Sequence, residues 1–369
     1  MTEPLDAAGF RDLFPALRRH TWLDTPGSPP AARPVSEVLR RTLDDWDAGE
    51  FDWLAWDRTP LGVRTLFASF LGVPDDTVAL VGSVSEAAAT VAAALPAGRI
   101  VVGDSEFRSN LYPWLQAQAG GREVVRVAPR DGALRTEDLV AALDGQTALL
   151  AVSEVLSSDG VRADLPELRA ATDRAGARLF VDASQSLGAL HLDVHAVRPD
   201  YLAVHGYKWM LCPRGAAWLV VREDRLAELE PLAPGWKSTE APHGYFGGDL
   251  TLPRSAARLD ASPAWFSWIG AEAALRLHAR LDRRAVEEHC VGLASAFLAE
   301  AEKVGCVPVA RGLPSQIVTV RVPDADRVHR KLAEQRIKCS LLGDRLRLGF
   351  HYFNDLGDVE RVLAALSAG

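Results

Sequence analysis

The sequence predicts an α/β fold, with a large domain built on a mostly parallel, seven-stranded sheet and a small α+β domain at the C-terminal end. Between residues 78 and 221, short apolar runs alternate with segments of helical spacing. Such alternation is typical of parallel strands joined by crossover helices. Beyond residue 263 the pattern changes to long helices followed by a few strands. Three parts are therefore expected: an N-terminal segment that covers the site (1–58), the large domain (59–263) and the small domain (264–369).

The N-terminal segment is predicted to be mostly helical. Residues 5–20 are expected to form a short helix, and the segment 21–30 after it holds three prolines and cannot be regular structure. The apolar spacing predicts helices over 34–58 and 60–72. Three tryptophans of this part are expected to serve in packing rather than in binding a cofactor: Trp46, Trp53 and Trp56.

The strands of the large domain are predicted from short apolar runs bounded by turn residues: 78–81, 99–102, 123–127, 148–153, 179–182, 201–204 and 216–221. Helices are predicted between them at 85–95, 111–118, 136–143 and 165–175. In the small domain we expect long helices over 264–304, further elements at 316–322, 328–335 and 345–349, and a closing helix at 356–366.

Composition and charge limit the partners of the protein. The 369-residue chain carries a net charge of −8, whereas nucleic acid and anionic membranes need a basic surface, so small molecules are the expected ligands. Its four cysteines are dispersed without a CxxC pair, which indicates neither a disulfide framework nor a zinc site. The N-terminus lacks the features of a signal peptide, and no stretch is long enough to span a membrane. We expect a soluble, cytoplasmic protein.

The candidate catalytic residues lie at the ends of two predicted strands. One apolar run ends in Asp182, and the next ends in His205, with Lys208 close behind. Because ligands bind at the carboxyl ends of strands in open α/β sheets, these side chains are expected to meet at one site. An aspartate against a pyridinium nitrogen and a lysine able to form a Schiff base are two requirements of a pyridoxal phosphate (PLP) site. Gln185 can donate to a phenolic oxygen of the same ligand.

A nicotinamide dehydrogenase is the competing class for such a fold. Its dinucleotide site needs a G-x-G-x-x-G turn after the first strand, but the turn after strand 78–81 reads Gly82-Ser83-Val84-Ser85-Glu86. Ser83 and Glu86 satisfy the spacing of a helix capping box. A helix N-terminus after a glycine turn also suits a phosphate group, and the two interpretations of this turn are compatible.

At these residues the sequence resembles the class V aminotransferases, a superfamily of fold-type I PLP enzymes. The family pattern V-D-x-x-Q-x-x-G stands here as Val181 to Gly188, and the family lysine with its Gly-Pro-x-Gly turn stands as Lys208 and Cys212-Pro213-Arg214-Gly215. Cys212 departs from the pattern, which has glycine there. The resemblance covers nearly the whole chain and is strongest to the isopenicillin N epimerase-like and hercynylcysteine sulfoxide lyase branch. It implies the fold-type I architecture, PLP as cofactor and a homodimer with shared active sites.

The resemblance implies a role for each candidate residue. Lys208 would form the Schiff base, Asp182 would keep the ring nitrogen protonated, and Gln185 would bind the 3-oxygen. Arg347 would bind the α-carboxylate of the substrate. The remaining cofactor contacts are implied for residues that are far apart in sequence: Val84, Ser85, His205 and Tyr207 at the phosphate, Phe107 on the pyridine face, Ser157 at the cofactor oxygen, and Ser262 at the phosphate of the partner subunit.

PLP binding alone does not select the reaction. The sequence favours an enzyme acting at Cα of an α-amino acid, most simply a class V aminotransferase, with a C–S (β-elimination) lyase or an amino-acid epimerase as the alternative. All three reactions begin with removal of the Cα proton, for which Lys208 is the natural base. A desulfurase is disfavoured because Cys306 and Cys339 lie in predicted strand regions rather than on a loop. A catalytically silent binding protein of the same fold is a further alternative, against which the complete set of site residues argues.

Overall fold

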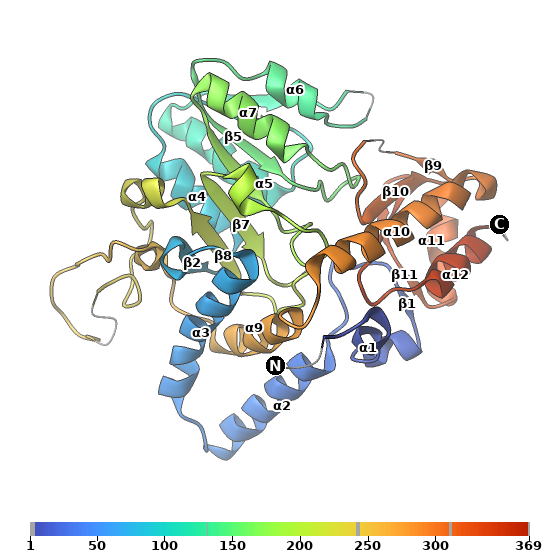
Figure 1. Ribbon diagram of the computed structural model, residues 1–369, viewed down its shortest axis with the longest axis horizontal. Coiled ribbons are helices and arrows are strands. Elements are labelled where there is room, and N and C mark those ends of the chain that lie inside the picture. The colour runs from blue at the N-terminus through green and yellow to red at the C-terminus, as the bar shows by residue number, and fades with distance from the viewer. Residues whose placement is uncertain (1–3, 131, 241–243, 310–311, 368–369) are drawn as a thin grey trace.

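The computed structural model describes residues 4–130, 132–240, 244–309 and 312–367. It contains the predicted seven-stranded sheet, several strands of which are labelled in Figure 1. Across the sheet the strands are β2 (Val78–Val81), β8 (Ala217–Val221), β7 (Tyr201–His205), β6 (Arg178–Asp182), β5 (Thr147–Ser153), β3 (Arg99–Gly103) and β4 (Val124–Val127). The five strands from β7 to β4 are parallel to one another, whereas β8 is antiparallel to both β2 and β7. The predicted fold class is confirmed.

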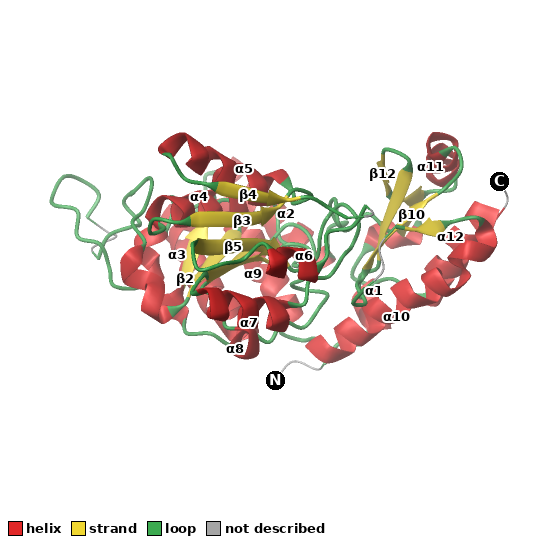
Figure 2. Cartoon of the chain, turned by 90° about the horizontal axis from the view of Figure 1, so that it is seen from above, coloured by secondary structure: helices red, strands yellow, loops and turns green. Residues whose placement is uncertain are grey.

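Helices cover both faces of this sheet, as Figure 2 shows. On one face lie α4 (Val84–Ala94) and α5 (Arg108–Ala117); on the other lie α3 (Trp53–Leu71), α6 (Thr136–Ala141), α7 (Leu165–Ala175), α8 (Val194–Val197) and α9 (Trp265–His278). All residues of β2, β5 and β8 are buried, because a sheet with helices on both faces exposes neither side to water. The continuous apolar runs in the sequence follow from this arrangement.

The helices of the N-terminal segment are divided differently from the prediction. α1 (Ala7–Arg11) is shorter than expected, and α2 (Arg33–Ala48) ends at Gly49, whose backbone is left-handed (φ 72°). α3 then starts after Asp52, whose carboxylate accepts a hydrogen bond from the Leu54 N–H (2.9 Å), and it continues through Pro60. The expected boundary near Pro60 was wrong because the helix break lies at the glycine and the capping aspartate.

The N-terminal tryptophans pack, but at the surface. Trp46 lies against Phe266 (5.3 Å between ring centres), and Trp53 lies against Trp265 (6.1 Å). Trp46 and Trp53 nevertheless stay 52% and 40% exposed. The rings therefore form part of an exposed aromatic surface instead of a buried core.

The small domain is an antiparallel sheet covered by helices. Its sheet has the order β12 (Ser340–Leu342), β13 (Arg345–Gly349), β10 (Ile317–Arg321) and β9 (Val307–Pro308), and its helices are α10 (Arg283–Ala301), α11 (Ala325–Glu334) and α12 (Leu356–Ser367). The N-terminal strand β1 (Thr21–Trp22) pairs with β11 (Ile337–Lys338) in parallel. The first two residues of the turn-rich segment 21–30 therefore form a strand, contrary to the prediction, and the pairing fixes the rest of the segment beside the small domain.

The helix α9, which we assigned to the small domain, packs on α2 and α3 and contributes Trp268 and Leu275 to the core of the large domain. This packing favours a domain boundary between α9 and α10. Of the helices in the described residues, none is long and apolar enough to cross a membrane.

Candidate active site

Asp182 and Lys208 meet at the carboxyl edge of the large sheet. Asp182 is the last residue of β6, and Lys208 follows the neighbouring parallel strand β7 by three residues. Both side chains are buried, at 6% and 5% exposure. Burial lowers the pKa of Lys208 to about 8, with the Asp182 charge acting in the opposite direction. A lysine with a lowered pKa keeps a share of neutral, nucleophilic amine near neutral pH.

The Asp182 carboxyl group is hydrogen-bonded to a residue that follows β6. It accepts a hydrogen bond from the Ser184 N–H (2.8 Å), and burial raises the pKa of the carboxyl group. The Ser184 hydroxyl in turn accepts from the His205 N–H (2.9 Å). These two hydrogen bonds connect the end of β6 with the end of β7. They hold together the two strand ends that were predicted from the sequence.

Phe107, the residue predicted to stack on the cofactor, lies beside the Lys208 amine. It is the residue before α5, and its ring centre is 5.1 Å from Lys208 Nζ. Its side chain is 49% exposed, which is high for an apolar ring. An aromatic face that is open next to the reactive amine suits a flat, partly apolar ligand. Stacking on PLP itself stays a prediction.

The residues predicted for the phosphate lie together at the start of α4. The Val84 N–H donates to His205 Nε2 (3.3 Å), and the rings of His205 and Tyr207 are 5.1 Å apart. Burial lowers the pKa of His205 to about 3, helped by the Lys208 and Arg214 charges, so this imidazole is neutral. Ser85 is half-buried in the first turn of α4. We define the phosphate cup as Val84, Ser85, His205 and Tyr207.

Gln185 and Ser157 are hydrogen-bonded to each other. Gln185 Nε2 donates to Ser157 Oγ (2.8 Å) and to the Pro26 carbonyl (3.0 Å), and Gln185 Oε1 accepts from Trp209 Nε1 (2.8 Å). The short Ser157 side chain is thus hydrogen-bonded to Gln185, the residue predicted to bind the 3-oxygen of the cofactor. Pro26 belongs to the turn-rich segment 21–30, so this segment reaches the site.

Arg347 enters the site from β13 of the small domain. Its Nη1 donates to the carbonyl and hydroxyl oxygens of Ser157 (2.7 and 2.8 Å), and its Nη2 donates to Ser340 Oγ (2.8 Å). The Asp24 carboxylate lies 3.7 Å away. Arg347 Nε is buried and has no hydrogen-bond partner among the described residues. A buried N–H without an acceptor is costly, and a ligand carboxylate would supply one.

Ser262 is separate from this cluster. Its hydroxyl accepts from Trp236 Nε1 (3.3 Å), and the preceding residue, Ala261, is hydrogen-bonded to the Leu80 carbonyl (3.0 Å). Within the described part of the chain, Ser262 forms no hydrogen bond with a residue of the phosphate cup. Its role toward a partner subunit stays a prediction.

Glu106 is a site residue that sequence reasoning missed. It is 5% exposed, and its carboxyl group accepts from the Ser153 N–H (2.6 Å), the Ser153 hydroxyl and Asn110 Nδ2 (3.1 Å). Ser153 lies opposite Asp182 in the β5–β6 register. Burial raises the pKa of Glu106 to about 7. Its place just before Phe107, after a buried strand, was the available signal.

Asp24 and Trp209 were also missed. The Ser340 hydroxyl donates to Asp24, which joins the N-terminal segment to the Arg347 cluster, and Trp209 is fully buried against Gln185. Asp24 lies in the turn-rich segment expected to cover the site, and Trp209 directly follows the lysine. These two sequence positions were the available indications, but a position in the sequence does not show which atoms a side chain will contact in the fold.

Two cavities border the site. One, of about 260 Å³, lies between the turn-rich segment and the loop after Lys208, and its lining includes Gly27, Pro29, Tyr207, Cys212 and Arg214. The other, of about 440 Å³, lies between the loop 159–162 and the small domain. Its walls do not include any of the predicted site residues.

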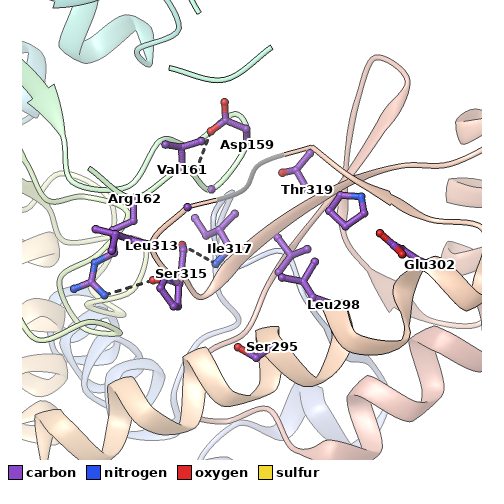
Figure 3. A pocket seen from close by; sticks show the side chains of 15 residues that line it. Asp159, Val161, Arg162, Ser295, Leu298, Glu302, Leu313, Ser315, Ile317 and Thr319 are labelled. Carbon is purple, nitrogen blue, oxygen red and sulfur yellow. Dashed lines mark hydrogen bonds between the residues drawn. The ribbon is translucent and has the colours of Figure 1, made fainter. Parts of the chain in front are cut away.

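Figure 3 shows the second cavity, with Ser295 and Leu298 on α10 facing the loop that carries Asp159 and Arg162. The Arg162 guanidinium is paired with Glu287 (2.7 Å) and Glu154 (3.5 Å). Its charge is therefore already balanced, and we interpret this cavity as a gap between the two domains rather than as the reactive centre.

The cysteines do not form a reactive group here. All four are free and buried: Cys212, Cys290, Cys306 and Cys339. Burial raises the pKa of Cys339 to about 12 and that of Cys306 to about 11. Within the described ranges, there is no group of three or more metal-binding side chains.

Comparisons with known proteins support the fold and the family resemblance. The family model "Aminotransferase class-V" matches residues 59–362. The chain is 30% identical to the uncharacterized aminotransferase YcbU of Bacillus subtilis (strain 168), over 97% of each chain. It is 28% identical to isopenicillin N epimerase of Amycolatopsis lactamdurans, over 86% of this chain and 87% of that protein. The fold is similar to that of the cysteine desulfurase CsdA from Escherichia coli, with a TM-score of 0.84 at 22% identity, over 99% of this chain and 98% of that chain.

Proposed function

The chain belongs to the class V aminotransferase family of PLP-dependent enzymes, and we propose that it acts at Cα of an α-amino acid through a Schiff base at Lys208. One observation carries the proposal. The buried amine of Lys208 lies beside the Phe107 ring, and the charges of Asp182 and Arg347 both act on its pKa. This arrangement provides a nucleophile, a partner for a ring nitrogen and a cation for a carboxylate around one atom.

The residues around Lys208 fit PLP. At one end, the start of α4 places the Val84 N–H beside the neutral imidazole of His205, and a helix N-terminus suits a phosphate group. At the other end, the buried Nε of Arg347 lacks an acceptor within the described structure, as expected for a guanidinium awaiting an amino-acid carboxylate. The open face of Phe107 lies between these ends and matches a flat ring.

The bound cofactor supplies an electron sink for the carbanion that forms at Cα. Asp182 would hold a proton at the pyridine nitrogen, because a carboxylate opposite that atom stabilises the positive charge. Arg347 would orient the amino acid by its carboxylate, which fixes the Cα–H bond toward Lys208. Lys208 would then accept the Cα proton, since its lowered pKa provides neutral amine near pH 8.

Among the reactions open to this site, we propose transamination, with C–S lysis or epimerisation as the alternative. The YcbU relative, which is matched over 97% of this chain, supports transamination, and the epimerase relative, matched over 86%, supports the alternative. A persulfide-forming desulfurase needs a mobile, reactive thiol, and burial raises the pKa of Cys339 to about 12. The buried thiol supports the sequence-based argument that disfavours that reaction.

Product analysis separates the remaining reactions. The purified enzyme would be incubated with a panel of L-amino acids, with and without 2-oxo acids, and the products identified by mass spectrometry and chiral chromatography. We expect a new amino acid that appears only with a 2-oxo acid. Ammonia and pyruvate without amino transfer would establish a lyase instead, and a D-amino acid or an epimer would establish an epimerase.

We also propose a homodimer, with an exposed aromatic surface as the interface. We define this surface as Trp46, Phe51, Trp53, Trp56, Trp236, Tyr245, Trp265 and Phe266. Ring contacts run through it from Trp53 to Tyr245 (6.0 Å) and from Tyr245 to Trp236 (5.6 Å), which donates to Ser262. Large exposed apolar patches usually mark interfaces, and this patch is continuous with the residue predicted to reach the partner's phosphate.

Light scattering tests the dimer. Trp53→Glu should shift the mass from dimer to monomer and weaken PLP retention, because the partner's Ser262 would leave the site. Leu356→Glu is the matched control, since Leu356 is 60% exposed but lies on the small domain. A monomeric wild-type enzyme, or a dimer that withstands Trp53→Glu, would contradict the interface.

A further inference from the structure

Arg214 is an uncompensated cation beside the phosphate cup. It lies in the turn after Lys208, and its guanidinium carbon is 4.6 Å from the centre of the Tyr207 ring. The side chain is exposed, and among the described residues it has neither an ion pair nor a side-chain hydrogen bond. It also lines the 260 Å³ cavity that adjoins the cup.

The cup itself contains no positive charge. Its contribution is a backbone amide from Val84, the hydroxyl of Ser85, the imidazole of His205 and the phenol of Tyr207. Burial lowers the pKa of His205 to about 3, so the imidazole stays neutral at physiological pH. Burial raises the pKa of Tyr207, so the phenol is uncharged too.

A phosphate ester with nearly two negative charges needs a cation close by when it is taken from water. Lys208 would not balance the charge of the phosphate, because its amine is used for the Schiff base. Arg214 is the cation that remains on this side, since its charge acts on His205, Tyr207 and Lys208 alike. The contact with the Tyr207 ring places the guanidinium beside a residue of the cup.

We infer that Arg214 supplies the positive charge of the phosphate cup and holds the cofactor through its phosphate group. The inference rests on the proposed assignment of Val84, His205 and Tyr207 to that phosphate. The same guanidinium chemistry would also suit a carboxylate at the far end of a substrate that enters the adjacent cavity. The position of Arg214 over the Tyr207 ring favours the phosphate.

Cofactor binding provides the test. Arg214→Met keeps the apolar stem that packs on Tyr207 but removes the charge, Arg214→Lys restores a charge, and Arg40→Ala removes an exposed arginine from α2 as a control. Dissociation constants of the apoenzymes for PLP, for pyridoxal and for inorganic phosphate would be measured by absorbance and by calorimetry, with thermal unfolding to verify folding.

We expect Arg214→Met to weaken PLP and inorganic phosphate roughly tenfold to a hundredfold, the range for losing a charge-assisted hydrogen bond. Pyridoxal, which lacks the phosphate, should bind all variants alike, and Arg214→Lys should recover part of the loss. Equal losses for PLP and pyridoxal would overturn the inference. So would unchanged PLP binding with a selective loss of activity on dicarboxylic amino acids, which would assign Arg214 to the substrate. A wild type that binds no PLP would instead overturn the proposed function.

Discussion

Arg347 donates two hydrogen bonds to Ser157, one to its carbonyl oxygen (2.7 Å) and one to its hydroxyl (2.8 Å). Arg347 belongs to the small domain and Ser157 to the loop after β5 of the large domain. The Ser157 hydroxyl also accepts from Gln185. The predicted carboxylate ligand and the predicted 3-oxygen ligand are therefore coupled through one serine, across the junction of the two domains.

This coupling makes Arg347 the first residue to test. Arg347→Lys should raise KM for the amino-acid substrate roughly tenfold to a hundredfold, because lysine cannot form the two-pronged contact with a carboxylate. PLP retention should stay unchanged, because the residues proposed to hold the cofactor's phosphate and ring belong to the large domain. Steady-state kinetics and the visible spectrum provide the two measurements, and a loss of the bound cofactor in this variant would count against the assignment.

Lys208→Ala should abolish the yellow colour of the enzyme. The wild-type colour should bleach with borohydride, because the reagent reduces a Schiff base, and mass spectrometry should then find the cofactor attached at Lys208. Activity should fall at least about a hundredfold with the loss of the general base. A wild-type protein that stays colourless with added PLP would refute the central assignment.

The sequence was sufficient to predict which side chains meet at the carboxyl edge of the large sheet, for a physical reason. Parallel strands end at one edge of a sheet, so Asp182 and His205, at the ends of adjacent strands, had to meet. The apolar runs of β2, β5 and β8 were equally readable, because strands buried on both faces lack polar positions. The seven strands of the large sheet were thus predictable from local patterns alone.

Contacts that depend on how separate segments pack were not predictable. The Asp24 contact with Ser340 and the Arg347 contact with Ser157 join distant parts of the chain, and no local spacing records them. The exposure of Trp53 depends on how α3 packs against α9, and the sequence predicted only that this ring would pack. Glu106 was missed because a single carboxyl after a strand resembles an ordinary surface residue until its burial is known.

Cys339→Ala should leave catalysis nearly intact. The thiol is 7% exposed, and burial raises its pKa to about 12, so almost no thiolate forms at neutral pH. Activity of the variant on the best amino acid should stay within about twofold of wild type, and any sulfide released from cysteine should be unaffected. Loss of sulfide release in Cys339→Ala would bring back the desulfurase reaction.

Glu106 should make the stability of the protein depend on pH. Burial raises its pKa from 4.5 to about 7 in the folded state. Between these values the unfolded chain releases the proton while the folded protein keeps it, so the stability contributed by Glu106 is full below pH 4.5 and is lost as the pH rises toward 7. The loss amounts to about 3 kcal/mol, at 1.36 kcal/mol for each pKa unit. Glu106→Gln removes this titration, because an amide does not ionise.

Urea unfolding between pH 4 and about 8 measures the effect. The free energy of unfolding of wild type minus that of Glu106→Gln should fall across the interval from 4.5 to 7 and stay level above it. Glu37→Gln, at an exposed position of α2, controls for the loss of one carboxylate. A difference that stays constant over this interval would show that Glu106 ionises equally in both states. The same result would mean that the carboxyl beside Phe107 is charged when the cofactor binds.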